Sequence, residues 1–256
     1  MAENYKKQSD KVAAYYDHWQ QGYNEVYGNF IQAFRPSDVD ELMQYIAASA
    51  HIHDGLKILD AGCGVGGPAI WLASRFNIEI AGITISEVQV SQAQEHVRQS
   101  DLSDKVSITQ GDYHELSRHY PAMYFDRVLF LESLGHAGDP ARVIREAWTT
   151  LKPGGSIYIK DFYYKEPDDA YWSTRIRKTM ENINRLYAYN CLNLTEIITA
   201  LRRTGFEIDF IRKFAFKDDI SVRQEFETRF GIDIFGGEPE FYPAEWLEIK
   251  CIRPQS

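Results

Sequence analysis

Apolar residues gather in short runs that alternate with stretches of helical periodicity along most of the chain. The short runs predict strands at residues 57–62, 79–84, 106–110, 125–131, 155–161, 206–214 and 245–253. Alternating strands and helices fold into a mainly parallel sheet with helices on both faces. We therefore expect an α/β protein with a seven-stranded, mainly parallel sheet.

Two segments fall outside this alternation. Residues 1–50, with a helix predicted around residues 11–17, are expected to form an N-terminal helical cap, and residues 163–200 are expected to form a lid. Ligands of such sheets bind beyond the carboxyl ends of the strands. The sequence thus predicts a single domain (1–256) with a cap (1–50), a ligand-binding core (51–162), a lid (163–200) and the last strands (201–256).

The first predicted strand leads into a glycine-rich turn. Gly62, Gly64, Gly66 and Gly67 follow Asp60, and a helical pattern begins directly afterwards. Glycines let backbone N–H groups at a helix start approach a nucleotide-like ligand closely. The spacing also fits the dinucleotide pattern G-x-G-x-x-G, so the turn alone leaves a nicotinamide cofactor open.

Residues after the next strands narrow the choice of cofactor. A nicotinamide enzyme is expected to carry an acidic residue at the end of the second strand, where this chain has Thr84. The third strand is followed by Asp112 and Tyr113, which suit an adenine amine and ring, and Leu151-Lys-Pro-Gly-Gly155 indicates a turn into the fifth strand. Together these features resemble the class I S-adenosylmethionine (SAM) methyltransferases, which implies a Rossmann-like fold for the sheet.

Shorter segments resemble one group of that family, the sterol, cyclopropane-fatty-acid and prenyl-diphosphate C-methyltransferases. They are Gly66-Gly-Pro68, Gly82-Ile-Thr-Ile-Ser86 with Gln89, Leu131-Glu-Ser-Leu-Gly-His136 and Tyr15-Tyr-Asp17. The resemblance implies that Thr84 and Gln89 meet the ribose or methionine end of SAM. The complete set of expected cofactor-binding residues is Asp60, Gly62, Gly64, Gly66, Thr84, Gln89, Asp112 and Tyr113.

The resemblance also implies a chemistry for residues after the fourth strand. Methyl transfer from a sulfonium to an alkene carbon requires an aligned acceptor and leaves a carbocation, which must be shielded from water and lose a proton. Glu132 is the candidate catalytic base, and His136 is the candidate proton relay or partner of Glu132.

The predicted substrate is a small isoprenoid, such as a prenyl diphosphate, or a similar apolar metabolite. A diphosphate would require cations and would add Mg²⁺ as a second cofactor. Tyr16 and Tyr163 are further candidates for substrate contact, and the candidate cations are Arg35, Lys160, Arg175, Arg177 and Lys178. His51, His53 and Asp54 lie close in sequence, but we predict no metal site there.

The amino-acid composition limits the classes of partner that the protein is expected to bind. The net charge of −9 argues against non-specific binding to nucleic acid or an anionic membrane. No apolar run is long enough to span a membrane, and three isolated cysteines indicate neither disulfides nor zinc. We expect a cytoplasmic protein that acts on a small-molecule substrate. The sequence leaves open whether the protein forms a homo-oligomer. An aromatic content of 14% suits an apolar ligand chamber.

Three other functions stay open at this point. An O- or N-methyltransferase of a small natural product or amine would use Glu132 or His136 to deprotonate or orient a heteroatom. A non-catalytic SAM-binding regulatory protein would keep the glycine turn and Asp112. A nicotinamide oxidoreductase is disfavoured by the missing acid after the second strand.

Overall fold

The computed structural model describes residues 2–167, 169–241 and 243–255. Within them, seven strands form one sheet in the order β3-β2-β1-β4-β5-β7-β6. β1 to β5 pair in parallel, whereas β7 is antiparallel to both β5 and β6. This confirms the predicted seven-stranded, mainly parallel sheet. The strands are β1 (Lys57–Ala61), β2 (Glu79–Thr84), β3 (Val106–Gln110), β4 (Phe125–Leu131), β5 (Leu151–Tyr164), β6 (Glu207–Arg212) and β7 (Ala244–Ile252).

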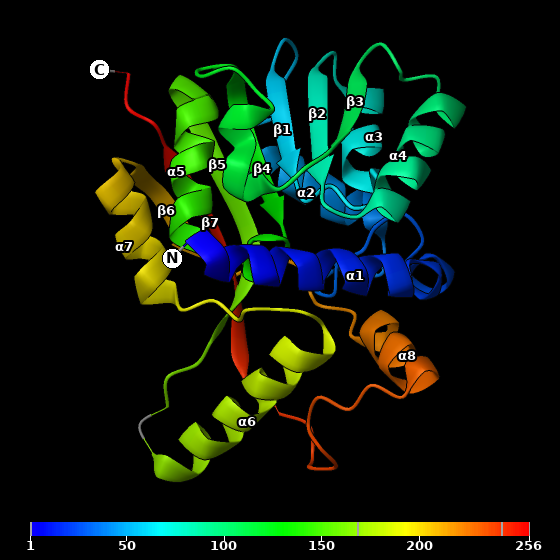
Figure 1. Ribbon diagram of the computed structural model, residues 1–256, viewed down its shortest axis with the longest axis vertical. Coiled ribbons are helices and arrows are strands. Elements are labelled where there is room, and N and C mark those ends of the chain that lie inside the picture. Colours follow the sequence, from blue (N-terminus) through cyan, green and yellow to red (C-terminus); the bar gives the residue numbers. More distant parts are fainter. Residues whose placement is uncertain (1, 168, 242, 256) are drawn as a thin grey trace.

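Helices cover both faces of the sheet (Figure 1). On one face α2 (Val39–Ser49), α3 (Gly67–Arg75) and α4 (Glu87–Gln99) bury side chains against the strands. On the other face lie α5 (Pro140–Thr150), α7 (Leu194–Thr204) and the short 3₁₀ helix η1 (Tyr113–Arg118). Successive residues of a strand point to opposite faces, so Ile58 packs in the first layer and Leu59 in the second.

β5 is longer than the predicted strand 155–161. It begins at Leu151, which pairs with Phe125, and its register shifts before Ser156 pairs with Arg127. Gly154 has φ +80°, a backbone conformation that glycine adopts readily. The turn predicted at residues 151–155 is therefore a bulge inside the strand.

The cap is built around α1 (Ala2–Tyr27), which has 26 residues where the sequence predicts a short helix around residues 11–17. α1 crosses one end of the sheet, with α6 (Ala170–Leu186) and α8 (Ser221–Phe230) on its other side (Figure 1). The predicted lid, 163–200, contributes α6, but α7 packs on the sheet because Ile197 and Leu201 are buried in the core. None of the helices that the structure describes is long and apolar enough to cross a bilayer.

Candidate active site

The glycine turn after β1 has the geometry that the sequence predicts. Gly62, Gly64 and Gly66 have φ values of +87°, +53° and +85°. A Cβ on Gly62 would lie 2.5 Å from the Cβ of Ser133, so a side chain is excluded there by contact as well as by conformation. α3 begins at Gly67, and Pro68 lies in its first turn. The N-terminus of a helix thus follows directly on the open backbone of the turn.

A cavity of about 80 Å³ lies at this turn, and we call it the turn cavity. Seven of the eight predicted cofactor-binding residues line it: Asp60, Gly62, Gly64, Thr84, Gln89, Asp112 and Tyr113. Gly66 does not line it, and instead allows the backbone to turn into α3. The residues come from the carboxyl ends of β1, β2 and β3, where a parallel sheet is expected to bind its ligand.

Asp60 is an unsatisfied acid in this cavity. Its side chain is 2% exposed, and its Oδ2 has no hydrogen-bond partner among the described residues. Burial raises the pKa of this carboxyl group to about 7. A buried acceptor without a donor suits a ligand that brings a donor or a positive charge.

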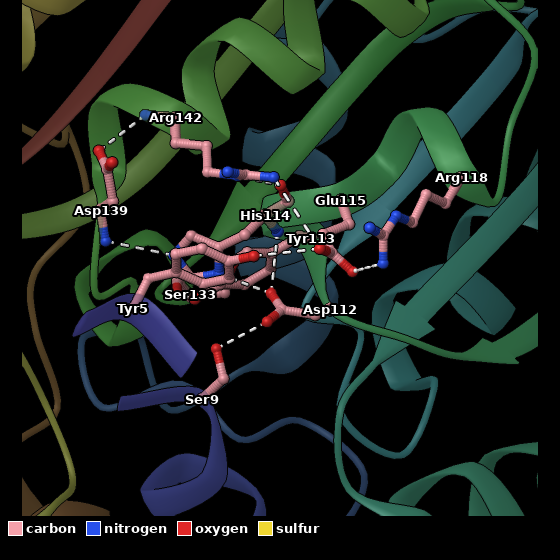
Figure 2. Close-up of polar contacts among 10 residues, drawn as sticks. All are labelled: Tyr5, Ser9, Asp112, Tyr113, His114, Glu115, Arg118, Ser133, Asp139 and Arg142. Carbon is pink, nitrogen blue, oxygen red and sulfur yellow. Dashed lines mark hydrogen bonds and ion pairs between the residues drawn. The ribbon is translucent and has the colours of Figure 1, made fainter. Parts of the chain in front are cut away.

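Asp112 is held from two sides (Figure 2). Its Oδ2 accepts a hydrogen bond from the Ser9 hydroxyl of α1 at 2.7 Å, and its Oδ1 accepts from the His114 backbone N–H at 2.9 Å and lies 2.6 Å from His114 Nδ1. Burial acts to raise the pKa of Asp112, but the bonds from His114 and Ser9 outweigh burial and lower it. The carboxylate therefore stays ionised at the edge of the turn cavity.

α1 also reaches the residues that follow β2. The Thr84 hydroxyl donates to Gln89 Oε1 at 2.7 Å, and Gln89 Nε2 donates to Gln20 Oε1 of α1 at 2.8 Å. The Ser86 hydroxyl donates to Asp17 Oδ1 at 2.5 Å. The predicted pair Thr84 and Gln89 is thus part of a buried chain of hydrogen bonds that ends on the cap.

A second, larger cavity adjoins the first. It measures about 270 Å³ and is enclosed by α1, the end of α6, α8 and the segment leading into β7, and we call it the aromatic cavity. Tyr16, Ile31, Glu132 and His136 line both cavities and therefore mark the boundary between them. The rings that line the aromatic cavity are Tyr16, Tyr23, Tyr27, Phe162, Tyr187, Tyr189, Phe235, Phe241 and Trp246.

Glu132 is held by an unusual backbone conformation and by several contacts of its carboxylate. Its φ is +57°, which is uncommon for a residue with a side chain and is found mainly where function or packing demands it. Its carboxylate forms an ion pair with the buried Lys160 and accepts from the Ala33 N–H at 2.6 Å and the Phe34 N–H at 3.2 Å. Burial lowers the pKa of Lys160, and Glu132 opposes this shift.

His136 is neutral in this environment. Its Nδ1 lies 3.1 Å from the Ala188 carbonyl oxygen, which can only accept, so Nδ1 carries the proton. Nε2 is then the acceptor for the Tyr16 hydroxyl at 2.9 Å. Burial lowers the pKa of His136 to about 4. An unprotonated imidazole nitrogen therefore faces the boundary between the two cavities.

The predicted substrate-binding residues lie apart, with one exception. Tyr16 lines both cavities, whereas the other four, and Arg177 and Lys178, line neither. The Arg35 guanidinium donates to backbone carbonyls, and Tyr163 packs in the core beside α7. Arg175 lies over the rings of Tyr171, Trp172 and Phe241. Among the described residues, no three His, Cys, Asp or Glu side chains are grouped as metal ligands.

Several residues of the site were not predicted. Ser9 and Gln20 of α1, Gln32 of the following segment and Ser133 after β4 all line or support the turn cavity. Ser9, Tyr16 and Gln20 are spaced by seven and four residues and therefore share one face of a helix. That spacing is a usable signal, but it becomes visible only if the helix is predicted over its whole length.

The sequence of this chain is similar to the sequences of known proteins. A family model described as "Methyltransferase domain" matches residues 52–216. A sterol 24-C-methyltransferase, erg6 of Aspergillus fumigatus, is 31% identical over 64% of this chain and 43% of its own. The 27-O-demethylrifamycin SV methyltransferase of Amycolatopsis mediterranei is 40% identical over 47% of this chain and 44% of its own. The chain thus matches less than half the length of these two relatives.

Solved structures share the fold. The [4+2]-cyclase SpnF superposes with a TM-score of 0.77 at 24% identity, covering 97% of both chains. A geranyl diphosphate C-methyltransferase from Streptomyces coelicolor A3(2), solved with Mg²⁺, geranyl diphosphate and S-adenosylhomocysteine, superposes with a TM-score of 0.68 at 14% identity over 96% of this chain and 97% of its own. At these identities the likeness concerns the fold alone.

Proposed function

This chain belongs to the methyltransferase-domain family, and from that premise we propose that it is a SAM-dependent methyltransferase that methylates an alkene carbon of a small, uncharged, largely apolar molecule of the isoprenoid kind. The observation that carries the proposal is the boundary between the two cavities. Glu132 and His136 stand between a glycine-turn cavity suited to SAM and a chamber walled by aromatic rings.

The turn cavity fits SAM on three observations. Gly62 leaves no room for a side chain, Asp60 is a buried acceptor without a donor, and Asp112 is an ionised acceptor at the far end of the β1 to β3 edge. Bound there, SAM supplies a methyl group that its sulfonium makes a good target for displacement. The residues named above would hold it by its nucleoside and amino-acid parts.

The aromatic cavity supplies what an alkene acceptor requires. Its rings exclude water and present negative faces to a developing positive charge. Its charged lining residues are Glu132, Asp218, Arg223, Glu227 and Glu240, so acids outnumber bases. Such walls stabilise a carbocation, and in this proposal Glu132, which lines the same cavity, accepts the proton that the cation loses.

The same lining argues for an uncharged substrate instead of a diphosphate. The only cation that lines the aromatic cavity, within the described chain, is Arg223, and its guanidinium is paired with Glu227 at 2.9 Å. Lys160 is turned onto Glu132 and the Phe34 carbonyl. A diphosphate would meet net negative charge there, which is costly in a partly dehydrated cavity.

His136 favours a second candidate, O- or N-methylation. Its Nε2 carries no proton, accepts from Tyr16 and lies at the boundary between the two cavities, where a general base for a hydroxyl or an ammonium group would be needed. In that reaction no carbocation forms, and the acids of the aromatic cavity would serve only in binding. The two candidate reactions therefore assign the role of proton acceptor to different residues, Glu132 in alkene methylation and His136 in O- or N-methylation.

An assay with methyl-labelled SAM tests the proposal. We expect label in uncharged alkenes such as farnesol or a sterol with an unsaturated side chain, and not in matched diphosphates with or without Mg²⁺. Glu132→Gln should lower kcat by about 100-fold or more, as the loss of a general base does, while His136→Gln has a much smaller effect. Label confined to phenols or amines, with dependence on His136, would instead support the second candidate.

The test needs a control for folding. Glu132→Gln leaves Lys160 buried and unpaired, which destabilises a protein by about 3–5 kcal/mol. The double variant Glu132→Gln/Lys160→Met removes both charges and should fold more stably than the single variant. If it binds S-adenosylhomocysteine as the unmodified protein does and yet keeps full alkene methylation, Glu132 is not the base.

A further inference from the structure

Gln32 is a buried amide with no partner. It lies between α1 and α2, its side chain is 2% exposed, and it lines the turn cavity. Neither Nε2 nor Oε1 forms a hydrogen bond within the described residues. By contrast, the amides of Gln20 and Gln89 donate at 2.7 and 2.8 Å. Since a buried amide without partners costs free energy, the unmet donor and acceptor of Gln32 point to a ligand.

The segment around Gln32 is fixed against the glycine turn on one side. A Cβ on Gly67 would lie 2.0 Å from the Asn29 carbonyl oxygen, so the two backbones touch. A Cβ on Gly64 would lie 4.0 Å from Ile31 Cδ1. The chain just before Gln32 therefore packs directly over the turn.

On its other side the segment is fixed to Glu132. The N–H groups of Ala33 and Phe34 donate to the Glu132 carboxylate. Gln32 thus follows the residues over the glycine turn and precedes those bound to Glu132. Asp112, the predicted adenine contact, is bonded instead to Ser9, which lies 23 residues before Gln32 in the chain.

We propose that Gln32 binds the amino-acid end of SAM, with Nε2 donating to its carboxylate and Oε1 accepting from its ammonium group; this inference rests on the proposed use of SAM. An amino-acid head group presents an acceptor and a donor side by side, which matches an amide with both functions unmet. Asp60, which lines the same cavity and whose Oδ2 has no hydrogen-bond partner among the described residues, supplies the negative charge that the ammonium group requires. The position beside the glycine turn and Glu132 assigns Gln32 to this end of SAM and not to the adenine.

A pair of ligands isolates the contact. S-adenosylhomocysteine carries the amino-acid end, whereas 5′-methylthioadenosine keeps the nucleoside and the sulfur but lacks that end. By calorimetry, Gln32→Leu should weaken S-adenosylhomocysteine binding by about 10- to 100-fold, the range for hydrogen bonds to charged groups. Its affinity for methylthioadenosine should stay within about twofold, because none of the lost bonds reaches that ligand.

Two control variants complete the design. Gln89→Leu breaks the chain from Thr84 to Gln20 and should weaken both ligands, and Gln99→Leu on the exposed part of α4 should change neither. The ligand-free Gln32→Leu protein should melt at a higher temperature than the unmodified protein, because an unpartnered amide is replaced by an apolar group of similar size. This rise shows that a loss of affinity does not come from unfolding.

The outcomes separate the inference from the function on which it rests. If the unmodified protein binds S-adenosylhomocysteine and Gln32→Leu binds it equally well, the inference is wrong and the function stands. Equal weakening of both ligands would assign Gln32 to the nucleoside and would also overturn the inference. If the unmodified protein binds neither ligand, the proposed use of SAM fails as well.

Discussion

His136 shows how burial sets the protonation state of a single residue. Burial lowers its pKa from 6.5 to about 4. Below pH 4 the imidazole is protonated in both the folded and the unfolded state, and above 6.5 it is neutral in both. Between these values only the unfolded state holds the proton, so the contribution of His136 to stability rises with pH from about 4 to 6.5.

We predict that His136 stays neutral throughout the range in which an exposed histidine titrates. In ¹⁵N-resolved NMR spectra, His136 should show the Nδ1–H tautomer and no change between pH 5.5 and 8, about 1.5 pH units or more above its pKa. The control is the same protein unfolded in denaturant, in which a histidine titrates at about 6.5. Titration of His136 near 6.5 would remove the basis for a neutral imidazole at the boundary.

The alternation of side chains between the two faces of β5 shows which substrate-contacting residues could have been predicted from the sequence. Lys160 and Phe162 share one face of the strand, where Lys160 meets Glu132 and Phe162 lines the aromatic cavity. Tyr163 points the other way, into the core beside α7. The predicted pairing of Lys160 with Tyr163 at one site thus contradicts the two-residue period of a strand. The period alone would have selected Phe162.

At the scale of elements, the cap depends on a close approach between α3 and the segment after α1. Gly67 has ordinary helical geometry, yet a Cβ there would lie 2.0 Å from the Asn29 carbonyl oxygen. Gly67→Ala should therefore push residues 28–34 off the turn, cost about 1–3 kcal/mol as over-packing does, and weaken S-adenosylhomocysteine binding by about tenfold or more, a loss of about 1.4 kcal/mol.

Gly55→Ala is the matched control for this prediction. Gly55 has φ +85°, and a Cβ there would meet nothing within 4 Å. The substitution should cost about 1–2 kcal/mol through backbone strain alone and leave ligand affinity unchanged. Denaturant unfolding and calorimetry on both variants separate the two effects. Equal affinities for Gly67→Ala and the unmodified protein would mean that the cap segment does not form part of the ligand site.

The elements divide into those that local sequence can predict and those that it cannot. The strand, glycine turn and helix at residues 57–75 are largely determined by neighbours in sequence, because Gly62, Gly64 and Gly66 have backbone conformations that glycine adopts readily. α1 and α8 bury their rings against each other instead, as Tyr23 stacks on Phe226 at 4.4 Å. These residues are about 200 positions apart, a separation that no local period reveals. The wall of the aromatic cavity therefore could not be predicted.

For the molecule as a whole, the cap lies across the carboxyl end of the parallel strands and contacts the residues that follow several of them. α1 is bonded to the residues after β2, β3 and β4 through Asp17, Ser9 and Tyr16. The segment after α1 is bonded to Glu132. A ligand in the turn cavity thus touches parts of the cap that are joined to three strands at once.

This arrangement predicts that S-adenosylhomocysteine, the product that SAM leaves after methyl transfer, slows amide hydrogen exchange in the cap. Saturating S-adenosylhomocysteine should slow amide hydrogen exchange in α1 and in residues 28–34 by about tenfold or more, because opening of the cap then requires loss of the ligand. α7, which packs on the sheet outside the turn cavity, is the reference element and should change little. Protection confined to the glycine turn would show that the cap moves independently of the ligand.

Two buried acids, Asp60 in β1 and Asp161 in β5, and the half-buried Asp218 link stability to pH. Burial raises the pKa of Asp60 to about 7, that of Asp161 to about 7 and that of Asp218 to about 6. An acid whose folded pKa lies above its unfolded value of 3.8 contributes stability that is complete below 3.8 and is lost as the pH rises through the folded pKa. For Asp60, the rise from 3.8 to about 7 corresponds to about 4 kcal/mol.

Asp60→Asn isolates this contribution. The variant should gain stability relative to the unmodified protein as the pH rises from 4 to 8, by a few kcal/mol in denaturant unfolding, because an amide pays no cost of ionisation. The exposed Ser100→Ala, which removes no ionisable group, is the control and should show no such trend. The same variant should bind S-adenosylhomocysteine more weakly at pH 8, where the Asp60 carboxylate would otherwise face the ligand's ammonium group. A variant that gains stability and also keeps full affinity would mean that Asp60 is a buried structural acid, and the turn cavity would then need another residue to balance the charge of its ligand.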